Sequence, residues 1–165
     1  MPLSNKSEQT QESSVNTGKA CRKQALDLLA RREHTRLELK RKLSARAYRH
    51  DTIDEVLDKL EMEGLLEEMR FVESFVRTRI NKGQGPLRIQ ADLVQRGVTE
   101  MNIRAGLTDA CQDWGKLASE VRHKRFGSAN PREFSERARQ IRFLQYRGFK
   151  KHQIDAALDF EGNPD

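Results

Sequence analysis

One sequence pattern occurs three times in this chain and limits what the chain can fold into. The pattern reads L-x-x-R-[GA]-[YVF]-x4-I-x3-L, and its copies begin at Leu43, Leu93 and Leu144, which are 50 and 51 residues apart. Repeats of this length are typical of one small structural unit used several times in a row. We therefore predict three similar units within the 165 residues rather than one domain around a single large core.

The centre of the pattern predicts a tight corner between two helices. Gly97 and Gly148 suit the left-handed conformation just past a helix end, where a side chain is strained, so both are assigned as structural helix caps. The arginine before each glycine then lies at the negative end of the helix dipole. The isoleucine and leucine that close the pattern are four residues apart, which places them on one face of the next helix.

A third helix is predicted before each pair, because apolar residues recur there at helical intervals. In the first unit these residues are Cys21, Ala25, Leu28 and Leu29. Further helix starts are indicated by the capping boxes Thr35-x-x-Glu38 and Thr52-x-x-Glu55 and by Pro86, which suits a first helical turn. The sequence therefore predicts an all-α fold of three tandem three-helix units, similar to helix-turn-helix repeats and stacked into an elongated, curved array.

The boundaries of these units follow from the repeat and from the composition at the two ends. The first 18 residues are polar and poor in large apolar groups, which is typical of disorder. The predicted segments are a disordered tail over 1–18, three-helix repeats over 19–66, 67–109 and 110–160, and a flexible tail over 161–165.

Charge is spread unevenly along the chain. The net charge is +6 overall, but +6 over residues 31–49, −7 over 51–68 and +7 over 110–151. Basic blocks attract polyanions, either nucleic acid or an acidic protein surface. Any single charge is more simply explained as part of a solvated helix face, and most acids of 51–68 are interpreted in that way. The two basic blocks together favour a binding function.

The sequence contains no recognisable catalytic set, and we expect neither an enzyme nor a cofactor. The four histidines stand singly and the two cysteines have no CxxC partner, so a metal site is not expected. No GxxxxGK[ST] or GxGxxG loop is present, and Gly83-Gln84-Gly85 is interpreted as a linker. The aromatic residues, Phe143 and Tyr146 among them, occur at helical spacing, which favours core packing over a base-stacking surface.

Cysteine usage and hydropathy predict the compartment. Cys21 and Cys111 are the only cysteines, and both are expected to be free thiols that pack as small buried hydrophobes. The start of the chain lacks the basic and apolar stretches of a signal peptide, and no run of 18 apolar residues occurs. We therefore expect a cytoplasmic monomer without a membrane partner.

The middle of the chain resembles the signature of the RecX family, RF(A/V)xxF…R…GxGPxRI. The matching residues are Arg70-Phe71-Val72, Phe75, Arg79, Gly83, Gly85-Pro86 and Arg88-Ile89. The two glycine corners resemble the L-x-x-(K/R)-G-(I/V/F/Y) corners of that family, and the likeness extends from about Ala20 to Leu158 in the same order and spacing. The first corner departs from the family pattern, because Ala47 replaces glycine, and it is expected to close differently.

This resemblance implies a function that residue spacing alone does not show. RecX-like proteins are implied to bind RecA nucleoprotein filaments, to lie in their helical groove and to restrain filament growth, ATP hydrolysis and strand exchange. The implied partners are the RecA filament and, in second place, single-stranded DNA. The residues predicted to contact them are Arg77, Arg79, Lys82, Arg88, Arg122, Lys124, Arg125, Arg142 and Arg147. The alternative is a free-standing DNA-binding protein that uses its helix-turn-helix-like units.

Overall fold

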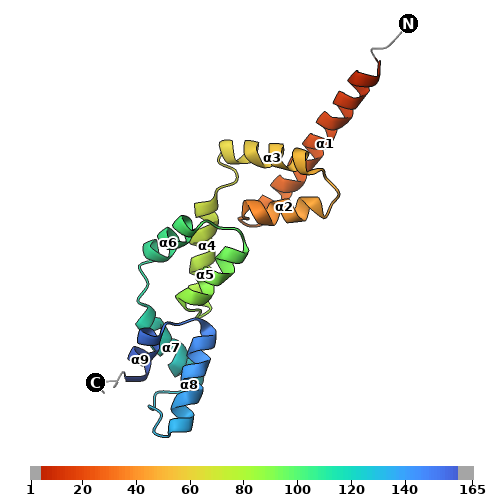
Figure 1. The fold of residues 1–165 in the computed structure, drawn as a ribbon. Helices are drawn as coiled ribbons and strands as arrows, with labels where there is room; N and C mark the ends of the chain where they lie inside the picture. Colours follow the sequence, from red (N-terminus) through yellow and green to blue (C-terminus); the bar gives the residue numbers. More distant parts are fainter. Residues whose placement is uncertain (1–4, 160–165) are drawn as a thin grey trace. The chain divides into compact units, whose positions relative to one another are not determined.

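The computed structural model describes residues 5–159, with side chains from residue 13 onward, so the predicted flexible tail over 161–165 lies outside the described residues. Every regular element within 5–159 is a helix (Figure 1), which confirms the all-α prediction. The helices are α1 (Asn5–Leu29), α2 (Arg36–Ser44), α3 (His50–Met62), α4 (Glu68–Asn81), α5 (Pro86–Gln95), α6 (Glu100–Asp109), α7 (Trp114–Phe126), α8 (Phe134–Arg147) and α9 (Lys151–Asp159).

The chain divides into two compact units, Met1–Phe71 and Val72–Asp165. The first unit holds α1, α2 and α3, and the second holds α5 to α9 with most of α4. The second and third repeats therefore belong to one compact unit, a grouping that the spacing of the sequence pattern does not reveal.

The core of the first unit is an apolar layer between α1, α2 and α3. Each helix contributes residues that recur every three or four positions and so lie on one face. The fully or almost fully buried members are Cys21, Ala25, Leu28, Leu39, Leu43, Ile53, Val56, Leu57, Leu60 and Leu66. Three residues of the stripe predicted for the first helix are thus buried and the fourth, Leu29, is partly buried, and Cys21 is the small buried hydrophobe that was expected.

The first helix is longer than the sequence predicts. Residues 1–18 are expected to be disordered, whereas α1 already begins at Asn5 and runs outward as a single helix beyond its contacts with α2 and α3 (Figure 1). The physical reason is that the buried residues from Cys21 onward fix the helix nucleus, and extending an existing helix costs far less than starting one. The prediction of disorder is therefore wrong for the described part of this segment.

One core cluster of the second unit lies where α7, α8 and α9 meet. Its buried residues are Leu117, Ala118, Leu144, Phe149, Ile154, Ala157 and Leu158. Ile80 of α4 and Trp114 of α7 pack against this cluster from its edge. Elsewhere in the unit Gly106 of α6 lets that helix approach α4, because a Cβ there would lie 2.2 Å from Cγ1 of Val72.

All three corners of the repeat have left-handed backbone conformations. Gly97 and Gly148 have φ values of 76° and 93°, and Gly148 is the residue that ends α8. Ala47 has φ 65°, so the first corner closes in the same way as the glycine corners and not differently. Cys111 has φ 47° just after α6 and is exposed, so the expectation that it is buried in a helix is wrong.

Two of the three predicted helix starts are present. Thr35 and Glu38 form the expected capping box at α2, and Pro86 occupies the first turn of α5. The capping box predicted at Thr52 is wrong, because α3 begins at His50, two residues earlier. The helix starts three residues after Ala47, at the same distance at which α6 starts after Gly97.

Candidate interaction surface

The second and third repeats are joined by hydrogen bonds between backbone atoms. The backbone N–H groups of Gly85 and Leu87, at the start of α5, donate to the carbonyl oxygens of Arg147 and Gly148 at 2.8 and 3.0 Å. These are groups that helix ends normally leave without partners. The end of α8 thus caps the start of α5, where no side chain does so. We call this contact the α5–α8 joint.

The glycines of the α5–α8 joint are required by close approach. A Cβ on Gly85 would lie 2.4 Å from the carbonyl carbon and oxygen of Gly148. A Cβ on Gly148 would lie 2.4 Å from Cβ and 2.6 Å from the backbone nitrogen of Arg88. One on Gly83 would lie 2.7 Å from Cγ2 of Val121. The Gly83-Gln84-Gly85 segment is therefore a packed contact and not the linker that the sequence suggests.

Two of the predicted binding residues flank this joint and are held by it. Arg88 donates to the carbonyl oxygen of Tyr146 at 3.2 Å, and its guanidinium lies 5.0 Å from the centre of the Tyr146 ring. Arg147 donates to the carbonyl oxygen of Lys82 at 2.9 Å and lies 5.2 Å from the ring centre of Phe143. Tyr146 itself is 75% exposed, so the expectation that it packs in the core is wrong.

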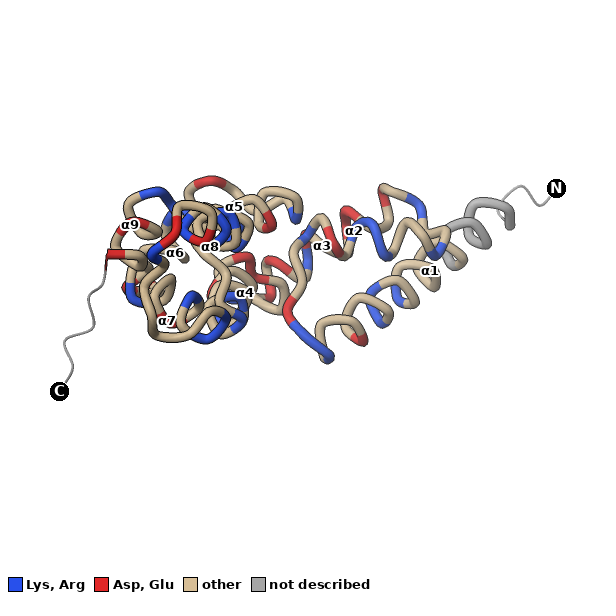
Figure 2. The backbone as a smooth tube through the Cα atoms, turned by 90° about the horizontal axis from the view of Figure 1, so that it is seen from below, with Lys and Arg blue, Asp and Glu red and all other residues tan. Residues whose placement is uncertain are grey.

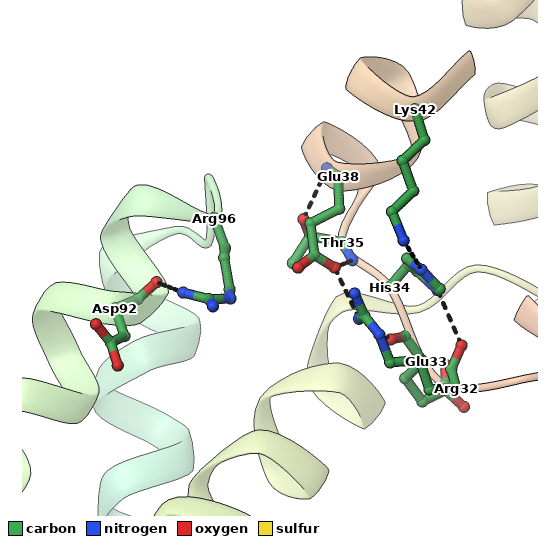
Figure 3. Close-up of polar contacts among 8 residues, drawn as sticks. All are labelled: Arg32, Glu33, His34, Thr35, Glu38, Lys42, Asp92 and Arg96. Atoms are coloured by element: carbon green, nitrogen blue, oxygen red, sulfur yellow. Dashed lines mark hydrogen bonds and ion pairs between the residues drawn. The ribbon is translucent and has the colours of Figure 1, made fainter. Parts of the chain in front are cut away.

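A second arginine pair surrounds Phe75 of α4. The guanidinium carbons of Arg79 and Arg96 lie 4.6 and 4.8 Å from the centre of its ring. Arg79 is 3.9 Å from the carboxylate of Asp92, and Arg96 donates to the Asp92 carbonyl oxygen at 2.8 Å (Figure 3). Arg96 therefore caps the end of α5, as its place in the repeat predicts, and Arg79 is half-buried against the same helix.

Five of the predicted residues point into solvent. They are Arg77, Lys82, Lys124, Arg125 and Arg142. Arg125 lies 5.9 Å from the ring centre of Phe126, and Arg139 of α8 lies 5.4 Å from the same ring. Phe126 in turn meets Phe143 edge to face at 5.2 Å, which links the end of α7 to α8. These contacts bring Arg125, Arg139 and Phe143 together, whereas no contact links Arg77 to them.

Arg122 does not belong to a binding surface. It is 4% exposed and donates to the carbonyl oxygen of Ala129, to Gln140 and to Asn130 at 3.2–3.3 Å. Its acceptors are neutral, and burial lowers the pKa of its guanidinium below the ordinary value. The prediction that Arg122 contacts a partner is therefore wrong. The side chain instead fastens the loop after α7 to α8.

Several basic residues of the first unit are neutralised by ion pairs within that unit. Blue and red residues lie beside one another along α2 and α3 in Figure 2. Arg36 of α2 forms ion pairs with Asp54, Asp58 and Glu61 of α3 at 3.6, 2.8 and 2.8 Å. Lys40 pairs with Asp54 at 2.9 Å. The block of residues 31–49 therefore attracts a polyanion less than its net charge suggests.

His34 is a buried residue at the centre of a polar network just before α2 (Figure 3). Its side chain is 1% exposed, with Nδ1 3.0 Å from the carbonyl oxygen of Arg32 and Nε2 2.9 Å from Nζ of Lys42. A carbonyl oxygen only accepts, so Nδ1 carries the proton and donates, and Nε2 accepts from the lysine. The ring is therefore held in its neutral form.

We predict that this network makes stability depend on pH. Burial lowers the pKa of His34 below its ordinary value of 6.5, and the charges of Arg32 and Lys42 act in the same direction. Because the unfolded chain binds the proton first, the stabilisation is complete above pH 6.5 and is lost as pH falls below it. The expected slope of the unfolding free energy is at most about 1.4 kcal/mol per pH unit.

Urea unfolding followed by circular dichroism between about pH 7.5 and 5 tests this, since carboxylates titrate below that window. His34→Gln, which carries no titrating ring, is expected to have lower stability at pH 7.5 but a flatter dependence on pH. Parallel pH profiles for the two proteins would contradict a role for His34.

In the part of the chain that the structure describes, no group of three or more His, Cys, Asp or Glu residues is placed to hold a metal ion. No described helix combines the length and the apolar character needed to cross a membrane.

Comparison with known proteins agrees with this geometry. The fold defines a class of small proteins made of tandem three-helix domains, and three family profiles match the chain in order. They are described as RecX, first, second and third three-helix domain, and match residues 21–60, 68–107 and 116–158. The chain belongs to the RecX family of regulatory proteins.

Relatives and solved structures carry the same family name. "Regulatory protein RecX" of Pseudomonas savastanoi pv. phaseolicola is 44% identical over 151 residues, which cover 92% of this chain and 97% of the relative. That of Halorhodospira halophila is 50% identical over 138 residues, 84% of this chain and 86% of the relative. The crystal structure of RecX from Lactobacillus salivarius superposes with a TM-score of 0.74 at 23% identity, over 87% of this chain and 95% of that one, which shows the shared fold.

Proposed function

We propose that this chain binds the RecA–DNA filament and restrains filament growth, ATP hydrolysis and strand exchange, as a cytoplasmic monomer that needs no active site of its own. The observation that carries the proposal is membership of a family of regulatory proteins over all three repeats. Exposed basic residues of the second unit supply the affinity for a polyanionic partner. Lying against the filament is enough to obstruct subunit motion or the docking of the next monomer.

The structure argues against the alternative of a free-standing helix-turn-helix protein. In that mode the last helix of a unit enters the major groove and needs basic or amide side chains on its exposed face. The exposed or half-buried face of α3 carries Asp51, Asp54, Glu55, Asp58 and Glu61 instead. Such a helix is repelled by DNA phosphates. The candidate binding residues lie on α4, α5, α7 and α8 and just after α4, and none of them lies on α3, α6 or α9, the last helices of the three units.

The proposal is tested with RecA from the same organism on single-stranded DNA. Substoichiometric amounts of this chain are expected to lower DNA-dependent ATP hydrolysis and to shorten filaments seen by electron microscopy. Reversing Arg77, Lys82, Lys124 and Arg125 to Glu is expected to weaken both effects without loss of helix content, because all four side chains are exposed. Glu replacement of the exposed Arg104 and Lys151 is the control, since both already pair with acids four residues away. Unchanged ATPase and filament length at saturating protein would show that the proposal is wrong.

A further inference from the structure

An arginine-rich strip with one exposed aromatic ring runs along α8. Arg139, Arg142 and Tyr146 are separated by three and four positions, so they lie along one line of the helix surface. All three are exposed, and Tyr146, with 75% of its surface in solvent, is among the most exposed large side chains of the second unit. Arg88 of α5 joins the strip through its contacts with Tyr146.

The Tyr146 ring is exposed but has one neighbouring side chain, Arg88, which also bonds the Tyr146 backbone. Its backbone carbonyl accepts the hydrogen bond from Arg88, and the guanidinium of Arg88 lies 5.0 Å from the ring centre. Both residues lie directly beside the α5–α8 joint, which holds their backbones. A side chain that is ordered before binding loses less entropy when a ligand covers it. An exposed tyrosine held in this way is suited to contact a flat partner.

Charge along the strip favours an anionic partner. Within residues 13–159 no carboxylate forms an ion pair with Arg88 or Arg142, while Arg139 lies 3.6 Å from Glu136. Arg125 and Arg147 flank the strip through Phe126 and Phe143. Guanidinium groups beside a ring are the combination that holds unpaired nucleotides, because phosphates meet the charges and a base stacks on the ring.

We propose that this strip, comprising Arg88, Arg139, Arg142 and Tyr146, binds single-stranded nucleic acid, with one base stacked on Tyr146. Unpaired bases expose their faces to a side chain, whereas bases within a duplex are covered by their neighbours. The inference rests on the proposed function, since it locates where this chain meets the DNA of the filament. It also assigns a base-contacting role to a residue that the sequence pattern places in the core.

The test measures binding of the full chain to fluorescein-labelled oligo(dT) and to a duplex of the same length, without RecA. Tyr146→Ala is expected to weaken oligo(dT) binding roughly tenfold, since stacking contributes about 1–3 kcal/mol per base and 1.4 kcal/mol corresponds to tenfold. Tyr146→Phe keeps the ring and is expected to bind like the wild type. Phe134→Ala is the matched control, because Phe134 is an 87% exposed aromatic at the other end of the same helix.

Arg142→Glu is expected to reduce the slope of log K against log salt by at least about 0.7, the value for one phosphate contact on a single strand. Equal oligo(dT) affinity for Tyr146→Ala and Phe134→Ala would overturn the inference. The inference would also be overturned if Tyr146→Ala and Arg142→Glu weakened binding to RecA filaments but left oligo(dT) binding unchanged, because the strip would then contact acidic protein. In both cases the proposed function stands if RecA ATPase is still inhibited. The proposed function fails, and the inference stands, if oligo(dT) binding depends on Tyr146 but the wild-type chain does not inhibit RecA.

Discussion

Replacing Gly148 by alanine is expected to lower the free energy of unfolding of the second unit by roughly 3 kcal/mol, the sum of backbone strain and overpacking. Gly148 has φ 93°, where a side chain is strained. The new Cβ would also lie 2.4–2.6 Å from Cβ and the backbone nitrogen of Arg88. Backbone atoms cannot turn aside as a flexible side chain does, so the α5–α8 joint must open to admit it.

Urea unfolding measures this loss, with Trp114, the single tryptophan, as the fluorescence reporter of the second unit. Gly64→Ala separates strain from crowding, because Gly64 has φ 70° but nothing lies within 4 Å of a Cβ there. Its expected cost is roughly 1 kcal/mol, followed by circular dichroism because Gly64 belongs to the first unit. A Gly148 variant no less stable than the Gly64 variant would show that the joint is not tightly packed.

Arg122→Glu is expected to destabilise the second unit by roughly 3–5 kcal/mol, the cost of an uncompensated charge in the interior. The substitution removes the donors to Ala129, Asn130 and Gln140 and places a carboxylate among acceptors. The loop after α7 then loses its attachment to α8. From the sequence alone, the same substitution would be interpreted as the reversal of one charge in a binding surface.

The neighbouring Lys124→Glu distinguishes these interpretations, since Lys124 is exposed and the change in charge is identical. Lys124→Glu is expected to melt like the wild type and to alter only the binding of the filament. Arg122→Glu is expected to lower the melting temperature of the second unit. A stable Arg122→Glu variant with weakened RecA inhibition would instead return Arg122 to the binding surface.

Those features of the fold that depend on neighbours in the sequence could be predicted, and those that depend on distant segments could not. Helical stripes and the left-handed corners at Gly97 and Gly148 follow from spacing within a few residues. The packing of Gly85 on Gly148 joins segments more than 60 positions apart. The local sequence pattern around Gly85 does not indicate this contact, so the segment was interpreted as a linker. The repeat pattern aligns Ala47 with the two glycines, but the missing glycine led to the wrong expectation that this corner closes differently.

The candidate site divides in the same way. Helical spacing identifies which residues share a face, but not which face finds a neighbour. Tyr146 and Leu144 are two positions apart on α8 and so lie on different faces, and the structure shows that the face of Leu144 is the buried one, while Tyr146 is 75% exposed. Arg122 lies four positions after the buried Ala118, so helical spacing places it on the buried face of α7, and only its charge suggested an exposed position.

The α5–α8 joint also determines what kind of attraction for anions this part of the molecule can exert. A free helix start carries a partial positive charge and bare N–H groups, and it is a ready site for phosphate. Here the carbonyl oxygens at the end of α8 accept two of those N–H groups, and the two opposed helix ends compensate each other. Backbone dipoles are thus unavailable at the start of α5, and binding of a polyanion there relies on arginine side chains. Mutation can add or remove such side chains singly, so the strength of filament binding can change while the angle between the two repeats stays the same.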